Sequence, residues 1–131
     1  MTPTPVAAEG YYRNPSLSPA ILTDEGILYV SGQMPMDADG VVLGVGDIDV
    51  QLARVWEQIE AIVRAGGGRL SDIVRINAWT TSQEYVPKIQ AKRVELFAGG
   101  TPPASALVVV AGLVRPGALV EIDAVAHLRR P

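Results

Sequence analysis

The chain has 131 residues, of which 48% are hydrophobic and 19% are charged, which predicts a single compact domain spanning residues 1–131. Cysteine is absent and His127 is the single histidine, so disulfides, thiolate metal sites and zinc sites built from several imidazoles are excluded. The net charge of −3 argues against a surface that binds double-stranded nucleic acid, because such surfaces need clustered lysine and arginine.

Two features concern where the protein acts. No stretch approaches the roughly 20 apolar residues that span a bilayer, and residues 1–15 lack the charged and apolar regions of a signal peptide. We therefore expect a cytoplasmic protein with no membrane partner. The adjacent pair Arg129–Arg130 is expected to keep the chain end soluble rather than to bind nucleic acid.

The first part of the chain predicts an irregular segment followed by a hairpin. Residues 1–15 show little periodicity and are expected to be irregular, apart from a short edge strand around Tyr11–Tyr12. Residues 27–34 are apolar and rich in β-branched side chains, which predicts a strand. Asp37–Gly40 has turn chemistry, and residues 41–43 are expected to return as the second arm of the hairpin.

A helix and a second strand are predicted next. Apolar residues recur at spacings of three and four over residues 48–63, as on one face of a helix. Asp47 or Asp49 is expected to cap its start, and Gly66–Gly68 to end it. Residues 73–80 then form the second strand.

The last third predicts one more helix and two strands. Residues 81–84 have a capping-box pattern, and Pro87 is tolerated only in a first helical turn, so a helix is expected from there to about Phe97. Residues 106–114 are almost uninterruptedly apolar, as expected for a strand buried on both faces. Residues 118–128 alternate and predict the final strand.

The predicted order is ββαβαββ, an α+β fold with a mixed sheet and two helices on one face. The other face of this sheet is left without cover. Because a sheet rich in valine and alanine is unfavourable in water, we expect it to be buried by association into a homo-oligomer.

The final strand carries the first candidate for chemistry. Glu121, Asp123 and His127 share one face by the period of two, and apolar side chains occupy the other face. Asp123 and His127 are expected to pair or to meet solvent. Glu121 lies deeper in the strand and, if buried, is a candidate general base with a raised pKa.

A second candidate is the break in the first strand at Ser31–Gln33. Glycine within a strand marks a bulge or a close backbone approach, so Gly32 is expected either to serve packing or to line a pocket. Trp56 and Trp79 are expected in the core or an interface rather than as base-stacking platforms. The sequence contains neither a nucleophile elbow nor a nucleotide-binding glycine motif.

Four segments together resemble the Rid family, also called the YjgF family, over residues 16–128. They are Val30–Asp37, the helix before Gly66–Gly68, Pro102–Ser105 and Val120–Ala124. The resemblance implies a chorismate-mutase-like fold, assembled as a homotrimer with a central sheet barrel and small-molecule clefts between subunits.

The resemblance also implies a chemistry. The founding subfamily hydrolyses 2-imino acids and their enamine tautomers to 2-keto acids and ammonia, and it uses no cofactor. An arginine binds the substrate carboxylate, and a glutamate of the last strand, with backbone of the Ser-Gly-Gln bulge, positions the attacking water. By this resemblance the water-positioning pair is Glu121 and Gly32, and Ser31 and Ser18 are expected among the residues that contact the substrate.

The carboxylate-binding side departs from the family pattern. Ser105 stands where the family has the arginine, Ser18 where it has a tyrosine, and Ile89 where it has an asparagine. Arg115 is expected in the turn at the far end of the strand over residues 106–114, too far away to replace the arginine within one subunit. Losing a bidentate charged contact costs about 3 kcal/mol, so a pocket lined by Ser105, Leu107 and Ile89 favours a less anionic substrate.

Two kinds of function remain open. One is an enzyme in which Glu121 activates water or moves a proton on a neutral imine, enamine or carbonyl compound, with weak or absent 2-imino acid deaminase activity. The alternative is a non-catalytic trimer that binds a small metabolite. Nucleic-acid cleavage, an activity ascribed to some relatives, is disfavoured by the acidic balance and the lack of a second histidine.

Overall fold

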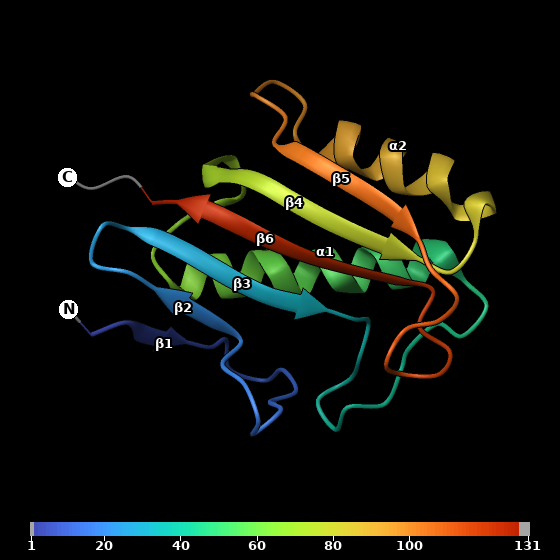
Figure 1. The fold of residues 1–131 in the computed structure, drawn as a ribbon, viewed down its shortest axis with the longest axis horizontal. Helices are drawn as coiled ribbons and strands as arrows, with labels where there is room; N and C mark the ends of the chain where they lie inside the picture. The colour runs from blue at the N-terminus through green and yellow to red at the C-terminus, as the bar shows by residue number, and fades with distance from the viewer. Residues whose placement is uncertain (1, 129–131) are drawn as a thin grey trace.

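The structure, a computed structural model, describes residues 2–128. It contains six strands and two α-helices around one sheet (Figure 1). In chain order the elements are β1 (Thr4–Val6), β2 (Ala20–Leu22), β3 (Ile27–Gln33), α1 (Ile48–Ala65), β4 (Ile73–Thr80), α2 (Val86–Leu96), β5 (Ala104–Val109) and β6 (Val120–His127).

The sheet has the strand order β1-β2-β3-β6-β4-β5. All neighbours are antiparallel except β4 and β5, which are parallel, so the sheet is mixed. Both helices lie on the same side of the sheet (Figure 1). The predicted α+β architecture with two helices on one face is confirmed.

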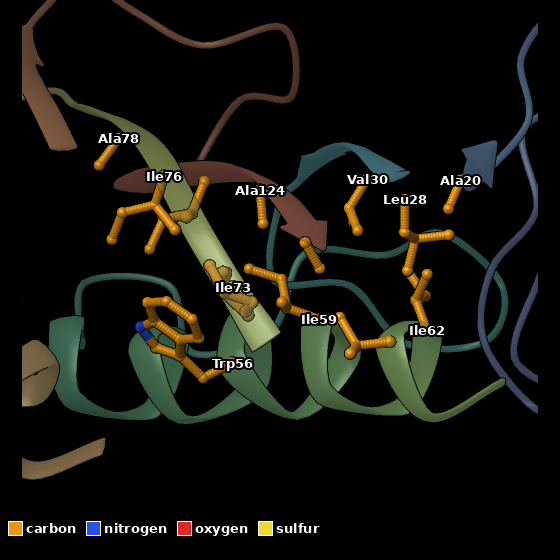
Figure 2. Close-up of a cluster of buried hydrophobic side chains, with 14 of the residues drawn as sticks. Ala20, Leu28, Val30, Trp56, Ile59, Ile62, Ile73, Ile76, Ala78 and Ala124 are labelled. Atoms are coloured by element: carbon orange, nitrogen blue, oxygen red, sulfur yellow. The ribbon is translucent and has the colours of Figure 1, made fainter. Parts of the chain in front are cut away.

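Helix α1 forms where the periodic apolar residues predicted it. The side chain of Asp47 accepts a hydrogen bond from the Val50 amide at 3.1 Å and so caps the N-terminus, while Asp49 pairs with Lys88 instead. Gly66 ends the helix. Trp56, Ile59 and Ile62 point from α1 to the sheet, where they meet side chains of the strands in the core (Figure 2).

Helix α2 starts later than its sequence suggests. Ser82, not Thr81, accepts a hydrogen bond from the Glu84 amide and caps a short 3₁₀ turn, and α2 follows with Pro87 in its first turn. The predicted capping box at residues 81–84 was therefore wrong in detail. The helix ends at Phe97, as expected, and the Phe97 ring meets Trp56 edge to face with 5.7 Å between ring centroids.

The N-terminal half differs from the prediction in two places. Tyr11–Tyr12 is not a strand; the short edge strands are β1 and β2, which pair with each other and extend the sheet beyond β3. The predicted arm at residues 41–43 is reduced to one isolated bridge between Met36 and Val42. Three-residue strands form only where a neighbour supplies the pairing, and local pattern does not reveal that neighbour.

Strand β5 also differs from the prediction of residues 106–114 buried on both faces. It covers Ala104–Val109 and stands at the edge of the sheet, paired with β4 alone. Val108 and Val109 are 47% and 43% exposed in the single chain. The apolar residues at positions 110–114 belong to the loop before β6, so the apolar segment in the sequence is longer than the strand itself.

Candidate functional site

Glu121 lies near the start of β6, on the face of the sheet that points away from the helices. Burial alternates along β6, with Val120 and Ile122 buried and Glu121 and Asp123 half-buried. Glu121 is paired directly with Trp79 of β4, and Trp79 in turn with Val108 of β5, so these three side chains form one row across the outer face.

The carboxylate of Glu121 rests against Gly32 of β3. The pairing of β3 with β6 is irregular between Val30 and Gln33, so the predicted bulge is present. A Cβ atom on Gly32 would lie 3.1 Å from Cδ of Glu121 and nearer still to Oε2. Only a residue without a side chain leaves this space, and the structure thus brings the two predicted residues together.

The surroundings of Glu121 disfavour its charged form. Burial raises the pKa of the Glu121 carboxyl above its usual range, and the nearby negative charge of Asp123 raises it further. Within residues 2–128 no group donates a hydrogen bond to this carboxylate or forms an ion pair with it. A carboxyl with a raised pKa and unused oxygens is suited to taking up and returning a proton.

Ser31 and Ser18 fix the neighbouring backbone. The hydroxyl of Ser31 donates to the Ser18 carbonyl at 2.7 Å, and the Ser31 amide donates to the Pro19 carbonyl at 2.9 Å. Ser18 therefore faces Ser31 through its backbone. The two bonds hold the segment before β2 against the bulge that carries Gly32.

Gln58 of α1 supports the same bulge from the helix side. It is 4% exposed, and its amide donates to Gln33 Oε1 at 3.0 Å and to the Met34 carbonyl at 2.9 Å, while its oxygen accepts from the Met36 amide. Sequence reasoning missed Gln58. The available signal was a polar residue on the apolar face of the predicted helix, seven positions after the equally buried Gln51.

Two of the residues predicted for substrate recognition, Ser105 and Leu107, lie on the other face of the sheet. Ser105 is paired with Ile76 and Leu107 with Ala78, two side chains that point to the helices (Figure 2). Ser105 accepts a hydrogen bond from Arg93 of α2 at 2.5 Å. Within one chain these residues do not share a pocket with Glu121.

Ile89 needs a correction. It is fully buried in the hydrophobic core, and Leu107 packs against that core. A side chain with no exposed surface contacts protein rather than ligand, so Ile89 does not line a pocket. The assignment followed the sequence position of a family residue, which does not reveal which way a helical side chain points.

A cavity of about 100 Å³ adjoins Gly32 near the end of β3. Arg115 lines it together with Tyr12 and Arg13, and none of these three residues was predicted to belong to a site. Arg115 donates to the Tyr12 hydroxyl at 3.1 Å and to the Gly40 carbonyl at 3.2 Å. The run of tyrosine, arginine and asparagine at residues 11–14 was the only local signal.

The other residues singled out from the sequence are Asp123, His127, Trp56 and Trp79, and they lie either in hydrogen-bonded or packed positions or in solvent. The Asp123 side chain accepts a hydrogen bond from the Asn77 amide at 3.1 Å, and His127 is exposed. Trp56 is in the core, whereas Trp79 is half-buried on the outer face.

No helix of the described chain is long and apolar enough to cross a membrane, and residues 2–128 contain no cluster of His, Asp and Glu that could hold a metal.

Comparison with known proteins places the fold and the site in context. The endoribonuclease L-PSP family model matches residues 10–128. A solved structure of the conserved Rid family protein YyfA from Yersinia pestis has a TM-score of 0.89 at 29% identity, covering 97% of this chain and all of that one. A Pseudomonas aeruginosa protein of unknown function is 34% identical with a TM-score of 0.83, covering 97% of this chain and 93% of its own.

RidA from the Antarctic bacterium Psychrobacter sp. is a third similar structure. It is 28% identical and has a TM-score of 0.84, with 95% of this chain and 99% of that chain covered. The family match extends over strands β2 to β6, both helices and both residues of the Gly32–Glu121 contact. The chain therefore belongs to the Rid family, whose sequence model is described as endoribonuclease L-PSP.

Proposed function

We propose that the protein is a cytoplasmic small-molecule enzyme of the Rid family in which Glu121 activates water or moves a proton on an imine, an enamine or a related carbonyl compound. The reaction needs no cofactor in this proposal. Its supporting observation is the carboxylate of Glu121 seated on Gly32, with a raised pKa and no partner within residues 2–128. Such a carboxylate can accept a proton from water and return it to a leaving amine.

The substrate is proposed to carry little negative charge where the founding subfamily binds a carboxylate. Ser105 replaces the arginine implied by the resemblance, and a hydroxyl offers one hydrogen bond where a guanidinium offers a charged fork. We therefore expect weak or absent hydrolysis of 2-imino acids. The contact between Ser105 and Arg93 does not change this expectation, because Arg93 reaches the helix face of the sheet.

The active assembly is proposed to be a homotrimer with ligand clefts between subunits. The outer face of the sheet supports this proposal because it presents Tyr29, which is 50% exposed, and Val108, which is 47% exposed, beside the half-buried Trp79. A second copy of the chain would remove these side chains from water. Sedimentation equilibrium should then give three times the 13.9 kDa chain mass.

The alternative is a trimer that binds a metabolite without changing it. The loss of recognition groups favours this alternative: Ser105 lacks the charge of the family arginine, and Ile89 is buried in the core. RNA cleavage is not proposed, because the net charge is −3 and a single histidine offers no acid–base pair.

The two functions are separated by Glu121→Gln. The experiment measures ammonia release from a panel of neutral and anionic imines and enamines generated in solution, together with the mass of the assembly. Turnover by the native protein that disappears in an intact Glu121→Gln trimer supports the enzyme. Binding of panel compounds without turnover by the native protein supports the alternative, and dissociation of the variant trimer assigns Glu121 a structural role.

A further inference from the structure

The cavity beside Gly32 is formed within one chain by four separate segments. They are the N-terminal segment before β2, the end of β3 with the residues after it, helix α1, and the loop between β5 and β6, which contributes Arg115. Figure 1 shows the loop after β3 and the loop before β6 next to each other at the end of the sheet, where Gln51 binds the carbonyls of Leu43 and Gly117.

The lining contains both apolar and basic side chains. Met34, Met36 and Ile62 supply apolar surface, and Arg13 and Arg115 supply positive charge. Neither an aspartate nor a glutamate is among the residues that line the cavity. The side chains around this space thus give it a positive potential next to apolar surface.

Arg115 is held in place but is not neutralised. Its guanidinium lies 5.1 Å from the centroid of the Tyr12 ring, and two of its N–H groups reach the Tyr12 hydroxyl and the Gly40 carbonyl. Within residues 2–128 it forms no ion pair, whereas Arg54 and Arg64 each pair with a glutamate of α1. A fixed guanidinium with unused donors is a ready anion site.

We propose that this cavity binds a small organic anion, with its carboxylate on the Arg115 guanidinium and a short apolar body against Met34, Met36 and Ile62. A volume of about 100 Å³ has room for roughly seven non-hydrogen atoms. The site is built within a single chain and is distinct from position 105. The proposal concerns binding and does not rest on the reaction proposed at Glu121.

The test measures binding of butyrate and of its uncharged analogue butyramide by calorimetry and by amide chemical shifts. A ligand of about six non-hydrogen atoms is expected to bind in about the millimolar range. Butyrate should bind at least tenfold more tightly than butyramide, and its shifts should include Gly32 and Tyr12. Arg115→Gln should lower butyrate affinity at least tenfold, and Arg64→Gln, an exposed charge-matched control, should leave it unchanged.

Arg115 also ties the N-terminal segment to the loop at Gly40, so its loss can affect folding. Arg13→Gln avoids this difficulty because Arg13 is exposed, and it should weaken butyrate binding while leaving the unfolding temperature unchanged. Equal affinity for butyrate and butyramide, or native affinity in both arginine variants, overturns the proposal. Inorganic phosphate binding more tightly than butyrate overturns the role given to the apolar side chains Met34, Met36 and Ile62.

Discussion

The contact between Gly32 and Glu121 predicts that Gly32→Ala destabilises the protein when Glu121 is present but not when Glu121 is replaced by alanine. The added Cβ in Gly32→Ala would lie 3.1 Å from Cδ and 3.4 Å from Cγ of Glu121, and closer to Oε2. Non-bonded heavy atoms are in ordinary contact at about 3.5 Å, so the Glu121 carboxylate must move by about 1 Å to accommodate the added Cβ. Because a carboxylate is the end of a flexible side chain, we expect a loss of only about 1 kcal/mol in unfolding free energy.

The same substitution has the opposite effect once the carboxylate is removed. Gly32 does not have a positive φ, so alanine fits its backbone and restricts the unfolded chain. In a Glu121→Ala background, Gly32→Ala should therefore be neutral or stabilising by about 0.5 kcal/mol. The double-mutant cycle should give a coupling of about 1 to 1.5 kcal/mol.

Urea unfolding of the four proteins at one fixed protein concentration measures this coupling, because association shifts apparent stability. Crystal structures of the single variant should show the displaced carboxylate directly. An equal cost of Gly32→Ala in both backgrounds would refute the seating of Glu121 on Gly32. Such a result would also remove the observation that supports the proposed function.

Three further predictions concern the sheet face and the helix that support the site. Because the pKa of Glu121 is raised in the folded protein, the folded chain accommodates the charged carboxylate less well than the unfolded chain does. The stabilisation contributed by the protonated Glu121 is therefore present at acidic pH, and it is lost as the pH rises through the folded-state pKa. Glu121→Gln should thus be more stable than the native protein at neutral pH, and the gain should vanish in acid; a gain independent of pH would contradict this. Asp47→Ala removes the N-cap of α1 and should lower the unfolding free energy in urea by about 1 kcal/mol. Asp49→Ala removes only an exposed ion pair and should lower it by less than about 0.5 kcal/mol. The reverse order would assign the cap to Asp49. Gln51→Leu should cost about 2 kcal/mol, because the Leu119 amide and the Gly117 carbonyl lose their partner in two partly buried hydrogen bonds. A neutral effect would mean that the two loops hold without Gln51.

The long periodic elements could be predicted because their own residues determine them. Helix α1 follows from the apolar spacing over residues 48–63, and the two faces of β6 follow from strict alternation. The strands β1 and β2 could not be foreseen, because three-residue strands depend on pairing with β3. Strand β5 was placed too late, since apolar residues continue past its end into a loop.

In the candidate site, too, some features could be predicted from the sequence and others depend on contacts between distant residues. Gly32 and Glu121 were paired through the resemblance, and the structure adds the geometry that brings them into contact. The contact of Tyr12 with Arg115 joins residues 103 positions apart, so no local pattern points to it. Ile89 occupies a family site position in the sequence, yet the packing of α2 directs its side chain into the core.

The central claim is that Glu121 and Gly32 form a working water site with an altered substrate preference. The most direct test is hydrolysis of 2-iminopropionate, generated in solution, by the native protein, by Ser105→Arg and by Ser105→Arg combined with Glu121→Gln. We predict weak or no turnover by the native protein, a gain in Ser105→Arg, and loss of that gain in the combined variant. Efficient turnover by the native protein, or a gain that persists without the Glu121 carboxylate, would contradict the claim.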